Sequence, residues 1–248
     1  MNDPGFIVSL ILVFLLAGTV KGVIGLGLPT VSLALLTVIS DLKVAMALLL
    51  VPSAITNFWQ AIQGPDTRAV VCRIWPFLAA ATIAIFFGAM ALNLVNLPLL
   101  SALLGLLLVI YALSSLAGVR IPPALGRHRG FAVGMGMTNG LLTGMTGSFV
   151  VPGVMYLQSL ELQKDHLIKA MGMLFLLSTV ALGLALGRYD LLSSGTLMLS
   201  SAAVLPAIAG MWLGKLVRDR LSEVTFRRTF YLALLVLGLY ITFNAIIT

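Results

Sequence analysis

The chain has 248 residues, of which 60% are apolar and only 9% are charged. A soluble domain carries about 25% charged residues, so this composition excludes a soluble globular protein and indicates a polytopic membrane protein. The net charge of +7 is explained by basic cytoplasmic joints, and no nucleic-acid partner is expected. With one cysteine, Cys72, and two histidines, we expect no disulfide framework, no metal site and no cofactor.

Ten apolar segments follow one another along the chain, and short polar joints separate most of them. The first, second, sixth and seventh are too short as helices to cross a hydrocarbon core about 30 Å thick, at about 1.5 Å per residue. The other six are long enough to span. The predicted fold class is therefore all-α. The segments cover residues 6–20, 28–40, 44–62, 74–95, 97–119, 130–145, 149–160, 167–187, 191–213 and 228–247.

The basic residues gather on one side of the membrane when the chain crosses it alternately from an outer N-terminus. The outer joints then hold only Lys43 and Arg188, and the inner joints hold the other thirteen of the fifteen Lys and Arg residues. This asymmetry is typical of basic cytoplasmic loops, so both termini are predicted to lie outside the cytoplasm. The first segment lacks a basic n-region, and we interpret it as a retained helix and not as a signal peptide.

Two glycine-rich stretches, GTVKGVIGLGLPT at 18–30 and GLLTGMTGSFVVPG at 140–153, are similar. Each half of the chain has five segments, an odd number, so the two halves must cross the membrane in opposite directions. The sequence predicts two inverted repeats, residues 1–120 and 121–248, in a single transmembrane domain, each beginning with a broken or short helix pair. The matched positions are Gly18 and Gly140, Gly22 and Gly144, Gly25 and Gly147, each pair 122 residues apart, and, within one residue, Pro29 and Pro152.

Each glycine-rich stretch should form a helix, a break and a second short helix. Proline is favoured in the first turn of a helix, so Pro29 and Pro152 should open the second helix of each pair. Helix N-termini carry free N–H groups and a partial positive charge, and two of them facing each other near the midplane would bind a small anion. The predicted substrate-binding residues are Thr19, Lys21, Gly22, Gly25, Gly27, Thr30, Asn57, Asn139, Thr143, Gly144, Gly147 and Ser148.

Several of these residues have a second interpretation, in which they only pack or anchor helices. Lys21 could instead extend to the cytoplasmic interface. Asn57 and Gln60 share one helical face, and could line the transport path or form an interhelical hydrogen bond. The glycines with the small-xxx-small spacing of closely packed helices are Gly18, Gly22, Gly136, Gly140 and Gly144.

The acidic residues all fall at predicted helix ends or joints. A proton-coupled pump typically keeps a carboxylate at membrane depth, and none is evident. An anion leaving a negative-inside cell gains about 2.3 kcal/mol per charge per 100 mV, so export could run on the membrane potential alone.

The duplicated Gly-x-x-x-Gly-x-x-Gly with a following proline, and the closing stretch LPAIAGMWLGKLVRDRLSEVTFRRTFYLALLVLGLYI at 205–241, resemble the TauE/SafE family of sulfite and organosulfonate exporters. The similarity covers nearly the whole chain. It implies a multi-pass permease of the bacterial inner membrane that moves a small sulfur anion, and in such a cell the outer termini predicted above would be periplasmic. It also implies that both glycine-rich stretches are functionally important, although Phe149 stands where members often carry further glycines.

Four other functions compete with anion export. An anion channel on the same frame would differ by its flux rate, and a permease for a small carboxylate would differ by its substrate. An enzyme would need a nucleophile and base, or metal ligands, at membrane depth, and no such set is evident, so no catalytic residue is expected. A non-transporting scaffold leaves the duplicated breaks unexplained. The expected partners are a small anion and the bilayer, and a homodimer is left open.

Overall fold

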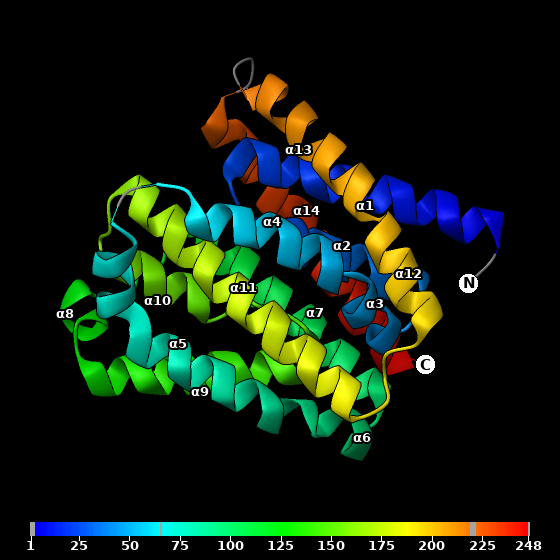
Figure 1. Cartoon of the computed structure of the whole chain (residues 1–248), viewed down its shortest axis with the longest axis horizontal. Helices are drawn as coiled ribbons and strands as arrows, with labels where there is room; N and C mark the ends of the chain where they lie inside the picture. The colour runs from blue at the N-terminus through cyan, green and yellow to red at the C-terminus, as the bar shows by residue number, and fades with distance from the viewer. Residues whose placement is uncertain (1–2, 65, 219–221, 248) are drawn as a thin grey trace. The chain divides into compact units, whose positions relative to one another are not determined.

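The computed structural model describes residues 3–64, 66–218 and 222–247, and this part of the chain is built from helices joined by short turns (Figure 1). The predicted all-α fold class is confirmed. In chain order the helices are α1 (Pro4–Ile24), α2 (Leu28–Ile39), α3 (Leu42–Leu48), α4 (Leu50–Ile62), α5 (Thr67–Ala89), α6 (Ala91–Leu94), α7 (Leu97–Leu116), α8 (Pro123–Gly126), α9 (Arg129–Thr146), α10 (Gly153–Ser159), α11 (Lys164–Arg188), α12 (Ser194–Ala202), α13 (Val204–Arg218) and α14 (Glu223–Ile247).

Six helical stretches of the described chain are long and apolar enough to cross a membrane, which confirms a multi-pass membrane protein. The short helices predicted after each break are also confirmed, because α2 has 12 residues and α10 has 7. The six stretches are Pro4–Ile24, Thr67–Leu94, Leu97–Leu116, Lys164–Arg188, Ser194–Arg218 and Val224–Ile247.

One prediction about an individual segment is wrong. The first segment is not too short to span, because α1 continues through Gly18 and Gly22 for 21 residues, about 31 Å at ~1.5 Å per residue. The segment at 44–62 forms two helices, α3 and α4, which meet at a bend of 43° and are together long and apolar enough for a broken span. Pro52, in the first turn of α4, has no N–H with which to continue the α-helical hydrogen-bond ladder.

The chain forms two compact units, and neither is continuous in sequence. The first unit comprises Met1–Pro52, Leu97–Ala117 and Leu192–Thr248, and the second comprises Ser53–Asn96 and Gly118–Leu191. Each unit therefore combines helices from both predicted repeats. The compact packing therefore follows a different division from the predicted repeat boundary at residue 120.

In the first unit, α1 packs along α13, and α7 packs on α14. Added Cβ atoms would collide with the carbonyl of Ala207 at Gly18 and with the carbonyl of Met211 at Gly22. Since residue numbers rise together along both helices, α1 and α13 run parallel. The alternating crossing scheme requires this direction for the first and ninth segments. The packing interpretation of these two glycines is confirmed.

In the second unit, α9 packs along α5 in the same manner (Figure 1). Gly140 lies against the carbonyl of Ala81, and Gly144 lies against the carbonyl of Ile85, so these two helices are also parallel. Gly140 and Gly144 are the repeat counterparts of Gly18 and Gly22. Each unit therefore contains one close parallel helix pair whose contact is made by the same duplicated glycines.

Candidate functional site

The first glycine-rich stretch interrupts the chain between α1 and α2. Helix α1 ends at Gly25, which has φ 77° and donates its N–H to the Lys21 carbonyl at 2.8 Å. Helix α2 follows Gly27, which has φ 108°, and Pro29 lies in its first turn. A side chain at either glycine would be strained in this left-handed conformation. The predicted order of helix, break and helix is confirmed, with Pro29 at the start of the second helix.

The second stretch interrupts the chain between α9 and α10. Helix α9 ends at Gly147, which has φ 74° and donates its N–H to the Thr143 carbonyl at 2.7 Å. Pro152 is the N-cap of α10, which starts at Gly153. The second break is therefore confirmed, and Gly147 repeats the backbone conformation of its counterpart Gly25.

Asn139, on α9, is fully buried and holds the start of α10. Its side-chain oxygen Oδ1 accepts a hydrogen bond from the Gly153 N–H at 2.9 Å. Because only the oxygen of an amide can accept this bond, the amino group Nδ2 must point elsewhere. Nδ2 is buried and has no hydrogen-bond partner among the described residues. An unsatisfied buried donor costs ~1–3 kcal/mol, and an acceptor supplied by a ligand would remove this cost.

The hydroxyl groups of the second break hold its own backbone in place. Thr143 Oγ1 donates to the carbonyl of Ser148 at 2.8 Å, and Thr146 Oγ1 accepts from the Ser148 N–H at 3.2 Å. Phe149 turns inward and packs against Phe175 of α11, with ring centroids 6.1 Å apart. Thr143 and Ser148 thus shape the break around Asn139, and Phe149 fills the core of the unit.

The predicted residues of the first break lie close together but have different surroundings. Thr19 Oγ1 donates to the carbonyl of Leu15 at 2.8 Å, within its own helix. Lys21 is buried, with 4% of its surface exposed, in the last turn of α1, where a cation is favoured by the helix dipole. Gly22 lies in the contact with α13, and Thr30 is buried in the first turn of α2. The N-cap Gly27 provides no side-chain cap for α2.

Helix α4 contributes two buried amides to the second unit. Gln60 Nε2 donates to the carbonyl of Ile168 on α11 at 2.9 Å, which confirms an interhelical hydrogen bond for this residue. Asn57, three residues earlier, is fully buried. The sequence predicts Lys169 in an inner joint. In the structure Lys169 is buried, and its Nζ donates to the Gly64 carbonyl at 2.7 Å. The apolar residues on either side of it, at 168 and 170–171, are the sequence feature that indicates a buried position.

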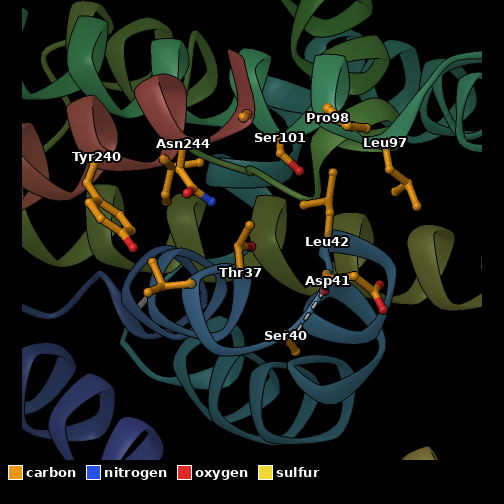
Figure 2. A pocket seen from close by; sticks show the side chains of 12 residues that line it. Thr37, Ser40, Asp41, Leu42, Leu97, Pro98, Ser101, Tyr240 and Asn244 are labelled. Carbon is orange, nitrogen blue, oxygen red and sulfur yellow. Dashed lines mark hydrogen bonds between the residues drawn. The ribbon is translucent and has the colours of Figure 1, made fainter. Parts of the chain in front are cut away.

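One cavity of the first unit, of about 180 Å³, lies at the C-terminal end of α2, away from the Gly25–Gly27 break (Figure 2). It contains none of the predicted substrate residues. The carboxylate of Asp41 lines it and caps α3 by accepting the Val44 N–H at 2.9 Å. A negative charge here disfavours an anion. The polar lining residues are Thr37, Ser40, Asp41, Ser101, Tyr240 and Asn244.

A second cavity of the first unit, of about 250 Å³, is almost entirely apolar and lies beside the first break. Val20 and Phe230 line it, and a Cβ atom added at Gly27 would lie 3.0 Å from Val20 and 3.5 Å from Phe230. An apolar wall cannot replace the hydration of an anion. Asn139, at the second break, remains a described side chain with a buried donor that has no hydrogen-bond partner in the structure.

The chain matches the model of a known family. The model of a family described as Sulfite exporter TauE/SafE matches residues 10–241, which include both glycine-rich stretches and the closing stretch at 205–241. No curated protein and no solved structure matches the chain.

Proposed function

The chain belongs to the TauE/SafE sulfite exporter family of membrane transporters, and from this premise we propose that it exports a small sulfur-containing anion, sulfite or an organosulfonate, across the bacterial inner membrane. The duplicated breaks at Gly25 and Gly147 support a transporter, because interrupted helices at matching positions of two repeats are the usual location of substrate sites in secondary transporters.

The observation that carries the anionic character of the substrate is the amide of Asn139, and the choice of a sulfur anion rests on the family. Its Oδ1 is engaged by Gly153, and its Nδ2 is a buried donor without an acceptor among the described residues. A fully ionised oxyanion only accepts hydrogen bonds, so it can accept the hydrogen bond that Nδ2 donates, whereas a cation cannot. The same amide fixes the start of α10, and an anion at Nδ2 would therefore contact the helix break directly.

The proposed driving force is the membrane potential. The acidic side chains that the structure describes are all exposed, so none of them is a buried carboxylate of the kind that carries protons at membrane depth. Asp219 and the side chain of Glu223 lie outside the described part. Export of a monovalent anion gains about 2.3 kcal/mol per 100 mV. The exposed acidic residues are Asp3, Asp41, Asp66, Glu161, Asp165 and Asp190.

The test is flux through proteoliposomes that contain the purified protein. Sulfite, thiosulfate, an organosulfonate and a small carboxylate are compared under an imposed voltage, with protein-free liposomes as the control. We expect the sulfur oxyanions to move and the carboxylate to move much more slowly. Movement of carboxylates or cations alone would contradict the proposed substrate class, and resolvable single-molecule currents would indicate a channel.

A further inference from the structure

The second unit contains a basic cavity of about 460 Å³ that shares no residue with the predicted substrate site. It lies where α5 and α9 begin, beside α8 and the end of α10. Three arginines line it: Arg73 on α5, Arg127 after α8, and Arg129 at the start of α9. Arg129 is ten residues before Asn139, about 15 Å along the helix, so this cavity and the second break are separate.

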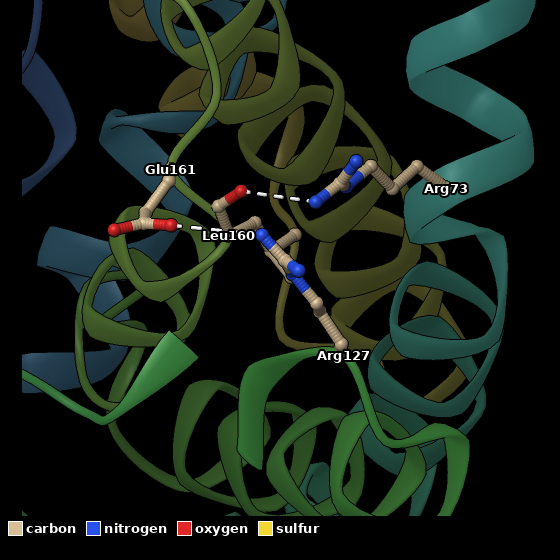
Figure 3. A network of polar contacts seen from close by, with 4 residues as sticks. All are labelled: Arg73, Arg127, Leu160 and Glu161. Atoms are coloured by element: carbon tan, nitrogen blue, oxygen red, sulfur yellow. Dashed lines mark hydrogen bonds and ion pairs between the residues drawn. The ribbon is translucent and has the colours of Figure 1, made fainter. Parts of the chain in front are cut away.

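The arginine side chains approach the turn after α10 from two different elements (Figure 3). Arg73 Nη2 donates to the carbonyl of Leu160 at 3.1 Å, which holds the guanidinium group at the cavity. Arg127 lies 3.7 Å from the carboxylate of Glu161, and both side chains are more than 60% exposed. A surface ion pair of this kind is weak, so Arg127 can exchange Glu161 for another anion at little cost.

The charge and shape of the lining fit a phosphate group. Three arginines line the cavity, and Glu161 pairs with only one of them, Arg127, so the cavity carries excess positive charge. Arginine presents planar N–H donors that bind phosphate oxygens in pairs. The volume falls within the range of ~300–1,000 Å³ that is usual for small-ligand pockets.

The surroundings of the cavity indicate a lipid and not a soluble phosphate. Helix α5 starts a candidate membrane span, and the cavity lies in its first turns. Val71 and Trp75, four residues apart on one face of α5, are both exposed, and Trp75 lines the cavity. Exposed tryptophan is typical of a membrane interface. The basic joints also place this end on the cytoplasmic side, where anionic lipids gather.

We propose that this cavity binds the phosphate group of an anionic phospholipid through Arg73, Arg127 and Arg129, with the acyl chains lying along Val71 and Trp75. The site is independent of the transported anion. It holds the turn after α10 against the start of α5 from the cytoplasmic leaflet.

Cys72 provides a direct test, because it is exposed, lines the cavity and is the only cysteine of the chain. The full chain is purified in a neutral detergent and titrated with phosphatidylglycerol or phosphatidylcholine. The rate at which N-ethylmaleimide, an uncharged reagent, modifies Cys72 is then measured. We expect phosphatidylglycerol to slow the modification and phosphatidylcholine to leave it unchanged.

Arginine variants distinguish lipid binding in the cavity from attraction of the lipid by the general surface charge. Arg129→Gln removes a side chain for which the structure shows no hydrogen bond within the described chain, so the fold should be retained. The half-protecting concentration of phosphatidylglycerol should rise about fivefold in Arg129→Gln, and further in Arg127→Gln/Arg129→Gln, as expected for ~1 kcal/mol per basic residue. Arg120→Gln, which has the same charge change outside the cavity, should behave as the wild type.

Three results would overturn the proposal. Equal protection by inorganic phosphate alone would assign the cavity to a soluble anion. Equal protection by phosphatidylcholine would show that headgroup charge is irrelevant. An equal loss of protection in Arg120→Gln and Arg129→Gln would show that overall charge, and not this cavity, attracts the lipid.

Discussion

The carbonyl oxygen of Leu48 accepts a hydrogen bond from the hydroxyl of Ser200 at 2.7 Å, across 152 residues of sequence. In an α-helix this carbonyl would receive the N–H of residue 52, but that residue is Pro52 and has none. The same Ser200 oxygen accepts the N–H of Val51 at 3.1 Å. One side chain on α12 therefore satisfies both backbone groups at the bend between α3 and α4, as a broken helix in a membrane requires.

Ser200→Ala should therefore destabilise the protein. It leaves a buried carbonyl and a half-buried N–H without partners, and the buried carbonyl alone costs ~1–3 kcal/mol. The measurement is thermal unfolding in detergent. The matched control is Ser201→Ala, since Ser201 is exposed and donates only to Leu197 of its own helix. Equal melting temperatures for the two variants would contradict the role assigned to Ser200.

The glycines between α9 and α5 should not tolerate even one methyl group. Gly140→Ala places a Cβ against the backbone carbonyl of Ala81, which cannot move without separating the helices. We expect a loss of ~1–3 kcal/mol, as for other overpacked contacts. Gly134→Ala, on the same helix, has open space around its Cβ and should be neutral or stabilising. Thermal unfolding in detergent compares the two, and similar losses in both would show that the contact with α5 does not determine the effect.

The left-handed glycine at the first break should be needed for transport but not for insertion. Gly25→Leu forces a side chain into φ 77° at the end of α1 and should abolish sulfite flux. Gly118→Leu is the control, because Gly118 has a similar φ of 65°, open surroundings and a position outside both breaks. Membrane insertion of both variants is measured by the amount of protein in the membrane fraction, and flux is measured after reconstitution into proteoliposomes. Full flux in Gly25→Leu would show that this glycine only fills space.

Voltage alone should drive export. In proteoliposomes with an imposed potassium diffusion potential, sulfite efflux should rise with the potential and should persist when a protonophore removes the pH gradient at fixed voltage. The physical reason is the absence of a buried carboxylate among the described residues. Efflux that stops with the pH gradient at constant voltage would demonstrate proton coupling.

The breaks themselves could be predicted from the sequence, because glycine and proline constrain the backbone regardless of what packs around them. Gly25, Gly147 and Pro29 behave accordingly. The small-xxx-small pattern also predicted close packing. It did not identify the partner, because a stripe of small residues defines a face and says nothing of which helix covers it. The pairing of α1 with α13 and of α9 with α5 therefore emerged only in the structure.

Long-range polar contacts were the least predictable part of the fold and of the site. The bend at Pro52 depends on Ser200, which looks like an ordinary helical serine in the sequence. The sequence predicts Lys169 in a joint, because the Gly64 carbonyl that accepts its hydrogen bond lies 105 residues away. The sequence predicts Asn139 as a binding residue, but only the contact with Gly153 shows that its oxygen accepts a hydrogen bond while its amino group has no partner among the described residues.

The most direct measurement is sulfite efflux from proteoliposomes containing Asn139→Asp. The aspartate keeps an oxygen that can accept the Gly153 N–H, and it replaces the donor Nδ2 with an acceptor. The control is Asn93→Asp on α6, an exposed residue of the same unit. Efflux should fall at least about tenfold, as for the loss of a charged hydrogen bond worth ~1.5–3 kcal/mol, while membrane insertion and Asn93→Asp stay at the wild-type level. Wild-type efflux in Asn139→Asp would show that the anion does not bind at this amide.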